Sequence, residues 1–422
     1  MKKIKYPDYA NSTVSLANSI LKYFGAPVHH ETLGLLDRKF AEREYENVVV
    51  ILLDGMGKCI VDGNLEPDGF FASHLAGTYS AVFPPTTVAA TTSICSGLYP
   101  VEHCWLGWDC YYPKIDKTVT VFLNREAGTT RPAAEYPVAE TFCPYKNLVK
   151  QIRENGGQAY SLIPFEEPYP KNFEAISGWI EELTSRPGKK YIYAYWSEPD
   201  GCMHEKGCYS PEAKATLRQL EKQVQELTEK LSDTLVIVTA DHGHMNSRGV
   251  AIENYPKITE CLKRGLSLEP RAVNFFVKEE KKQQFEEEFR KNFSDTFLLL
   301  TKEEVREKKL FGPGKERSDF ERMMGDYLAV AVDDLSIYSH KKEADFSSVS
   351  MQGFEDEMDP PLLIGSEVPL PSCEAMSSEV ISFVIKVERM SYDDLIRCTS
   401  RLWKKRRLSV SYAGAQASGG GF

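Results

Sequence analysis

Carboxylate and imidazole side chains directly follow apolar runs at several points in this 422-residue sequence. Asp54 comes after the run 48–53 and precedes Gly-Met-Gly, and Asp241 and His242 come after the run 235–240. Carboxylate oxygen and imidazole nitrogen together suit zinc, manganese or iron. We therefore predict a metal site, with two alternatives: Asp54 as a helix cap, and Asp241 with His242 as a buried structural pair.

A second pair of ligand groups, Asp200 and His204, follows the apolar run 191–196. If this segment is helical, the spacing of four places both side chains on one face of the helix. An Asp-x-x-x-His pair is weak evidence by itself. Here it repeats the pattern of the first two motifs, in which a ligand group follows an apolar run.

A hydroxyl-rich segment at 83–93 offers a nucleophile. Pro84 and Pro85 end an extended stretch, and the small residues after them can begin a helix whose free N–H groups face a hydroxyl. Such a hydroxyl beside a metal ion could attack phosphorus while the helix N-terminus stabilises the phosphoryl oxygens. An ordinary threonine-rich helix start is the alternative.

These groups need a scaffold that brings strand ends together. Runs rich in Val, Ile and Tyr at 48–53, 191–196 and 235–239 predict strands buried on both faces of a parallel sheet. Between the last two, a helix is predicted to begin at Ser210-Pro211 and to carry an apolar stripe. Strand, helix, strand is typical of a doubly wound α/β fold, which places its sites at the carboxyl ends of the strands.

The chain is predicted to form one catalytic domain over residues 1–365. Its pattern changes at about 246–326, which we interpret as an inserted α+β cap subdomain, and the run 327–332 predicts a return to the main sheet. Residues 366–422 turn to Ser, Pro and charge, which predicts a poorly ordered C-terminal tail. The basic cluster at 404–407 is interpreted as part of this solvated tail.

The composition excludes several classes of protein. Lys and Arg number 51 against 61 Asp and Glu, a formal net charge of -10, so whole-chain charge does not favour nucleic-acid binding. No apolar run reaches the roughly 18 residues needed to span a bilayer, and no signal-peptide core is present. The 10 cysteines are scattered without a repeated CxxC pattern and indicate reduced thiols. We therefore expect a soluble cytoplasmic protein.

Four separated motifs resemble the type I phosphodiesterase/nucleotide pyrophosphatase family of the alkaline phosphatase superfamily. In order they are Asp-Gly-Met-Gly at 54–57, Phe-Pro-Pro-Thr-Thr through Val-Glu-His at 83–103, Asp200-x-x-x-His204, and Ala-Asp-His-Gly at 240–243. The resemblance covers about residues 45–365. It implies an alkaline phosphatase-like α/β fold, with a mostly parallel sheet flanked by helices, and metal-dependent hydrolysis of phosphodiester or nucleotide pyrophosphate bonds.

The resemblance also implies two divalent ions, with zinc favoured and manganese as the alternative. One ion would be held by Asp54, Thr87, Asp241 and His242, and the other by Asp200, His204 and a later histidine. Thr87 matches the nucleophile position, and Thr86 is the less favoured choice. Two such ions can clamp the attacking and leaving oxygens of an in-line phosphoryl displacement. We expect a small phosphorylated substrate such as a nucleotide, and neither a nucleic-acid polymer nor a membrane.

Two positions depart from the family's pattern. Asp109 stands where the family often has an Asn that donates to a phosphoryl oxygen, and a carboxylate there would repel phosphate unless protonated or turned away. Ser-Met-Gln-Gly at 350–353 stands where the family has His-x-Gly, and the motif resumes almost at once, as after a local frame change. His340 is a rival for the third histidine. His244 is either a residue behind the ligands or a turn residue.

Two other functions remain open. A phosphomonoesterase or phosphonate hydrolase using the same ions is the rival activity. A catalytically impaired member that binds phosphorylated ligands is the rival from another class, because the expected third histidine is missing. Metal content discriminates between these classes, since about two ions per chain would favour the enzyme.

Overall fold

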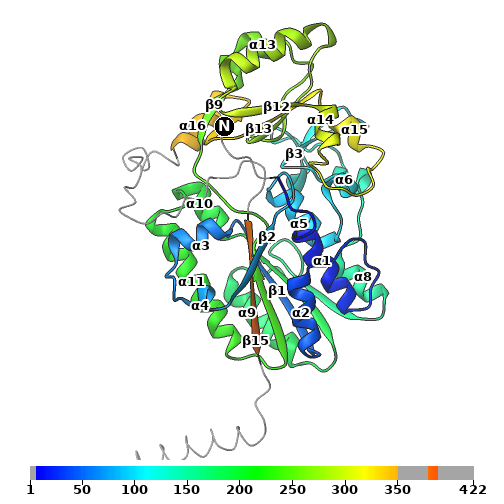
Figure 1. The fold of residues 1–422 in the computed structure, drawn as a ribbon, viewed down its shortest axis with the longest axis vertical. Coiled ribbons are helices and arrows are strands. Elements are labelled where there is room, and N and C mark those ends of the chain that lie inside the picture. The colour runs from blue at the N-terminus through cyan, green and yellow to red at the C-terminus, as the bar shows by residue number, and fades with distance from the viewer. Residues whose placement is uncertain (1–5, 350–378, 388–422) are drawn as a thin grey trace, which may run out of the picture.

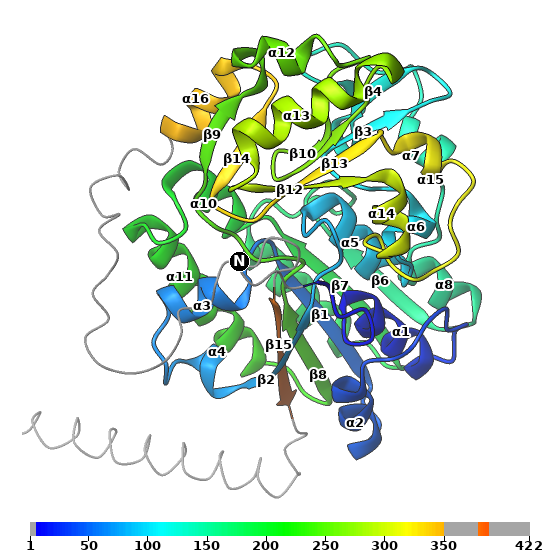
Figure 2. The same cartoon turned by 45° about the horizontal axis from the view of Figure 1, so that its top comes forward.

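The computed structural model describes residues 6–349 and 379–387, which form two large sheets and one two-stranded sheet, with helices around them (Figure 1). The central sheet has six strands in the order β2, β15, β8, β1, β7, β6. The second sheet has seven strands in the order β12, β13, β11, β10, β3, β4, β5. Figure 2 shows the second sheet and its helices capping one end of the central sheet.

The parallel part of the central sheet is built from the apolar runs of the sequence. β1 (Asn47–Leu53) pairs in parallel with β7 (Lys190–Trp196) on one side and β8 (Thr234–Thr239) on the other. β6 (Gln158–Leu162) continues the parallel set beyond β7. Every residue of β1 and β8 is buried, which explains why these runs are unbroken rather than alternating. The predicted mostly parallel sheet is confirmed.

Helices cover both faces of this sheet, with α3, α4 and α11 on one side and α1, α2 and α8 on the other (Figures 1 and 2). The predicted helix after Ser210 is α11: the Ser210 side chain accepts from the Ala213 N–H, and Pro211 is the first helical residue. The flanking helices are α1 (Thr13–Tyr23), α2 (Gly34–Glu42), α3 (Lys58–Asn64), α4 (Phe70–Ser73), α8 (Leu148–Glu154), α9 (Phe173–Ser185) and α11 (Pro211–Thr228). Every helix in the described ranges is too short or too polar to cross a bilayer.

The cap is an antiparallel sheet covered by α13 (Lys282–Phe293), which buries Phe285, Phe289 and Phe293. It draws on two separate parts of the chain, because β3, β4 and β5 come from well before the predicted insertion. Its strands are β3 (Asp109–Tyr112), β4 (Lys117–Thr120), β5 (Arg125–Glu126), β10 (Ser267–Glu269), β11 (Ala272–Phe275), β12 (Phe297–Thr301) and β13 (Tyr327–Ala331). Other elements beside it are α6 (Pro100–His103), α7 (Val138–Phe142), β9 (Arg248–Ala251), α12 (Pro256–Thr259), α14 (Lys302–Glu307), α15 (Phe320–Met323), β14 (Leu335–Tyr338) and α16 (Lys341–Val349).

The predicted return of 327–332 to the main sheet is wrong. β13 pairs antiparallel with β11 and β12 inside the cap sheet. All five of its residues are buried. An interior strand of the cap is therefore an unbroken apolar run, like a strand of the central sheet. Periodicity alone therefore does not say which sheet a buried strand joins.

The prediction of a poorly ordered tail from residue 366 is wrong for one segment. β15 (Glu379–Val387) lies antiparallel between β2 (Leu75–Ser80) and β8 in the central sheet. The polar composition of the sequence around it hid this nine-residue strand. The basic cluster at 404–407 lies outside the described residues.

Candidate metal centre

The predicted carboxylates meet at the carboxyl ends of three adjacent strands. Asp54 follows β1, Asp241 comes just after β8, and Asp200 begins α10 (Asp200–Lys206) beyond β7. The backbone N–H of Asp54 donates to the Trp196 carbonyl (3.0 Å), and that of Asp200 donates to the Asp54 carbonyl (3.1 Å). The backbone hydrogen bonds thus continue past the ends of the strands and hold the carboxylates together at the carboxyl end of the sheet.

Gly55 lets two of these carboxylates approach each other. Its φ is 70°, a conformation that favours glycine, and a Cβ placed there would lie 3.0 Å from Asp200 Oδ1. The Gly55 N–H also donates to Asp241 Oδ1 (3.2 Å). The Asp-Gly dipeptide after β1 is therefore required by the packing of the site.

The first ligand cluster gathers around the Thr87 hydroxyl, at the start of α5 (Thr87–Ser96). Thr87 Oγ1 lies 3.1 Å from His242 Nε2 and donates to Asp54 Oδ1 at 3.4 Å. His242 Nε2 is 3.3 Å from Asp54 Oδ1 and 3.6 Å from Asp241 Oδ2. The structure thus brings together all four groups that were predicted to share one ion.

The neighbouring hydroxyl points elsewhere. Thr86 precedes α5 but makes no side-chain capping hydrogen bond; its Oγ1 donates to Glu269 Oε1 at 2.6 Å. The same Glu269 oxygen accepts from the Trp108 backbone N–H (2.6 Å). The first N–H groups of α5 are therefore not capped by the Thr86 side chain, and of the two hydroxyls it is Thr87 that faces the carboxylates.

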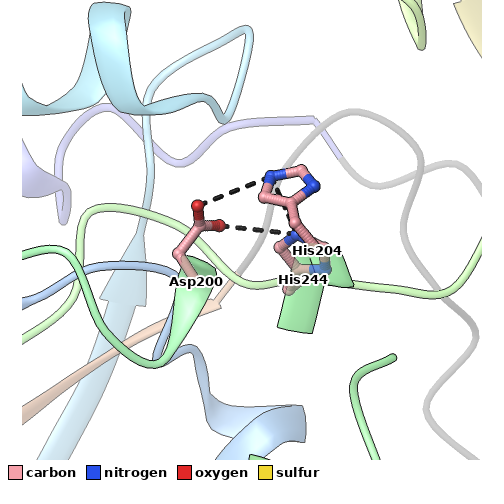
Figure 3. Close-up of side chains that lie close together, drawn as sticks. All are labelled: Asp200, His204 and His244. Carbon is pink, nitrogen blue, oxygen red and sulfur yellow. Dashed lines mark hydrogen bonds and ion pairs between the residues drawn. The ribbon is translucent and has the colours of Figure 1, made fainter. Parts of the chain in front are cut away.

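The second ligand cluster contains a residue that the motifs did not assign (Figure 3). His204 Nε2 lies 3.4 Å from Asp200 Oδ2, and both come from α10, as the spacing of four predicted. His244 Nε2 lies 3.4 Å from Asp200 Oδ1 and 3.4 Å from His204 Nε2. The available sequence signal was only its position, two residues beyond His242.

The two clusters adjoin. One atom each of Asp54, Asp200 and His242 lie within 4.8 Å of one another, as do one atom each of Asp200, His204 and His244. Asp200 is the carboxylate common to both groups. The two groups of candidate metal ligands therefore overlap at Asp200.

Crowded carboxyl groups dominate the electrostatics of the site. Burial, reinforced by Asp54, raises the pKa of Asp200 to about 7 and that of Asp241 to about 8. Burial lowers the pKa of His242, but Asp241 and Asp54 outweigh burial and hold this pKa well above its usual value. The carboxyl groups of Asp54, Asp200 and Asp241 thus lie around a single imidazole, that of His242.

The donor set fits divalent cations. Asp200 Oδ1 and Asp241 Oδ2 are buried and have no hydrogen-bond partner within the described residues. A buried carboxylate oxygen without a partner is costly unless a cation or a donor reaches it. Both atoms lie beside imidazole nitrogens, which matches the mixed oxygen and nitrogen ligands of zinc. No part of this fit depends on Asp109 or His340.

Those two candidate residues lie outside both clusters. Asp109 Oδ1 accepts from Thr120 Oγ1 (2.5 Å), so its carboxylate pairs across β3 and β4, and burial raises its pKa. His340 Nδ1 lies 3.0 Å from Glu253 Oε2, and its side chain is 66% exposed. The structure thus gives Asp109 a hydroxyl partner and places His340 on the surface of the cap.

The chain matches the model of the type I phosphodiesterase/nucleotide pyrophosphatase family over residues 48–356. It belongs to this family. Membership confirms the resemblance seen in the four motifs and makes the chain a phosphoryl hydrolase of the phosphodiesterase/pyrophosphatase type.

Solved structures share the fold of this phosphodiesterase family member. Human ectonucleotide pyrophosphatase/phosphodiesterase 5 is 16% identical with a TM-score of 0.57, covering 81% of this chain and 91% of its own. The murine protein, as an inactive threonine-to-alanine variant with AMP, is 17% identical with a TM-score of 0.56, covering 82% and 88%. Phosphonoacetate hydrolase from Sinorhizobium meliloti 1021, with phosphonoformate, is 15% identical with a TM-score of 0.52, covering 82% and 92%. The predicted alkaline phosphatase-like α/β fold is confirmed.

Glu269 is a partly buried carboxyl beside the family's site that sequence reasoning missed, and its titration gives a testable prediction. Burial raises its pKa to about 7, although Thr86 and the Trp108 N–H oppose the rise. Since the folded pKa exceeds the unfolded one, the native state holds the extra proton, and the stability gained at low pH is lost as pH rises towards 7. Wild type should therefore lose about 1–3 kcal/mol more than Glu269→Gln between pH 5 and pH 8.

The measurement is urea unfolding of both proteins at the two pH values, with a chelator present so that metal binding does not contribute. Gln keeps an oxygen for the Thr86 and Trp108 donors. Glu279→Gln, at an exposed side chain, is the control and should follow wild type. Equal pH dependence of wild type and Glu269→Gln would show that Glu269 is ionised throughout.

Proposed function

We propose that this phosphodiesterase family member hydrolyses phosphodiester or nucleotide pyrophosphate bonds with Thr87 as nucleophile and two divalent metal ions. One observation carries the proposal: the Thr87 hydroxyl, at the start of a helix, faces Asp54 and His242. The hydroxyl lies among carboxyl groups, two of which have a buried oxygen without a hydrogen-bond partner in the described residues. It is well placed for nucleophilic attack once cations neutralise the carboxylates.

The residues present define which groups would hold the ions. Asp54, Thr87, Asp241 and His242 would bind one, and Asp200 with His204 would bind the other. Zinc suits these ligands best, with manganese as the alternative. When bound, such ions act as Lewis acids that polarise phosphoryl oxygens and lower the pKa of a bound hydroxyl.

The chain's own groups account for attack and release. Thr87 Oγ1 loses its proton to solvent and bonds to phosphorus, while the bond from phosphorus to the leaving oxygen breaks. Water then adds its oxygen to phosphorus and releases a proton to solvent, the bond from phosphorus to Oγ1 breaks, and Oγ1 takes up a proton from solvent. The free N–H groups of the first turn of α5 bind the phosphoryl oxygens and their growing charge.

The comparisons support a small phosphorylated substrate. The murine relative is inactive as a threonine-to-alanine variant and is described in complex with AMP. The bacterial relative is described with phosphonoformate, which keeps a phosphonate substrate as the second candidate. These ligands belong to those proteins, and they support the proposed substrate class here.

Rates on matched substrates test the proposal. The bis-ester, the monoester and a phosphonate ester of one chromogenic alcohol are each assayed with Zn²⁺, Mn²⁺ or Mg²⁺ added to chelator-treated protein. We expect the bis-ester to be hydrolysed fastest, and zinc to support the highest rate. If the monoester or the phosphonate ester is hydrolysed faster than the bis-ester, the protein is a phosphomonoesterase or a phosphonate hydrolase instead. No hydrolysis with any ion would instead favour a phosphoryl-ligand-binding protein.

A further inference from the structure

We propose that His244 is the third protein ligand of the metal ion at Asp200 and His204, in place of the distal histidine that the sequence lacks. The inference rests on the proposed two-ion function and adds to it a residue that the family's motifs do not supply. Its basis is the geometry around Asp200 (Figure 3).

The three side chains already have the spacing of zinc ligands. Zinc–nitrogen and zinc–oxygen distances of about 2.0–2.1 Å at tetrahedral angles separate two ligand atoms by about 3.3 Å. The contacts from His204 to Asp200, from His244 to Asp200 and between the two imidazoles are each 3.4 Å. The imidazoles approach different oxygens of Asp200, so the carboxylate binds through both oxygens or turns slightly to use one.

His244 is held so that one ring nitrogen stays available. Its side chain is only 14% exposed, against 68% for His204. Its Nδ1 lies 3.1 Å from the buried Cys208 Sγ. A neutral histidine that binds a metal through Nε2 carries its proton on Nδ1, and here that proton would point at the sulfur.

The partner of His244 is itself fixed. The Cys208 N–H donates to Asn246 Oδ1 at 2.9 Å, and Gly207, just before it, has a φ of 91°. Cys59 Sγ lies 3.7 Å from the His244 carbonyl oxygen. Backbone and ring of His244 are thus both held by neighbours, as is common for metal-binding histidines.

The number of protein ligands explains why a third residue is needed at this ion. Asp200 and His204 alone would leave the ion with two protein ligands, whereas catalytic zinc sites commonly have three and keep one open position. The other candidate, His340, contacts Glu253 on the surface. Ser-Met-Gln-Gly, where the distal motif was expected, lies outside the described residues. His244 reaches Asp200 from the segment that already supplies Asp241 and His242.

Zinc binding to the full chain tests this proposal. Chelator-treated wild type, His244→Ala, His244→Gln and His340→Ala are titrated with Zn²⁺ in competition with a chromophoric chelator. We expect two ions per chain for wild type and for His340→Ala. Both His244 variants should keep one ion at wild-type affinity and bind the second at least about 100-fold more weakly, since loss of an outer partner alone costs about 10–100-fold.

Cys208 variants separate orientation from ligation. Cys208→Ala should weaken binding of the second ion about 10–100-fold, and Cys208→Ser should restore part of that loss because its hydroxyl can accept a hydrogen bond from Nδ1–H. Thermal unfolding in chelator shows whether each variant is folded before zinc is added. If Ala at position 244 unfolds the apo-protein, the Gln variant, of similar size, replaces it.

The outcomes are distinct. Two ions of unchanged affinity in both His244 variants would overturn the assignment of His244 and leave the two-ion function standing. Fewer than two ions in wild type would overturn the two-ion function itself. Loss of the second ion in His340→Ala alone would identify His340 as the ligand.

Discussion

Thr87→Ala should lower the rate of phosphodiester hydrolysis at least about 100-fold, because it removes the hydroxyl that we propose attacks phosphorus. Zinc binding should fall much less, since Asp54, Asp241 and His242 remain. Thr87→Ser should retain part of the rate because it keeps a hydroxyl. The measurement is kcat and KM on the bis-ester with saturating metal, and the loss should appear mainly in kcat.

Thr86→Ala is the matched control for this prediction. It removes an adjacent hydroxyl that donates to Glu269 and does not face the carboxylates, so its effect should be much smaller. Acid quenching during turnover, followed by peptide mapping, should find the phosphoryl group on Thr87. A modified peptide that maps to Thr86, or a Thr87→Ala variant with near wild-type kcat, would disprove the choice of nucleophile.

Asp241→Asn and His242→Ala should each remove most of the activity together with bound metal, because each loses a group that the proposal places on the first ion. Asp241 Oδ2 is buried without a hydrogen-bond partner in the described structure. Asp241→Asn replaces this carboxylate, which we propose binds the metal, by a neutral amide. Folding should largely survive, since Asn conserves shape and relieves carboxylate crowding. Metal content per chain and turnover are measured on the same samples.

The control for this prediction is an aspartate that accepts hydrogen bonds but lies away from the site. Asp37 accepts from Ser19, Thr32 and Lys22, away from the site. Asp37→Asn should keep both metal content and turnover. Wild-type metal content and turnover in either Asp241→Asn or His242→Ala would show that these residues are structural.

The parts of the fold that were predictable are those in which one short segment carries the whole signal. β1 and β8 are buried along their whole length and β7 over its first five residues, so each is visible as an apolar run, and the polar residues after them mark the site. Asp200 and His204 were predicted to share a helix face because their spacing is local. Thr87 was favoured over Thr86 only through the resemblance, and in the structure the two hydroxyls contact different carboxyl groups, Asp54 and Glu269.

What could not be predicted depends on contacts between distant segments. The cap sheet joins Leu268 to Asp109, a pairing that no local pattern announces. His244 follows β8 in an irregular segment, where no periodicity indicates the direction of a side chain. Glu269 reaches Thr86 from the cap, and nothing near either residue in the sequence marks that contact.

The position of β15 has a consequence for biosynthesis. A ribosome completes β2 and β8 long before residue 387 is made. Until then, the edge of each strand that later pairs with β15 has free N–H and C=O groups. Open strand edges are templates for pairing with other chains, so the unclosed sheet is exposed to aggregation at this stage. The segment that closes the central sheet is thus the last described strand to be translated, and the sheet can reach its final pairing only once synthesis has passed that point.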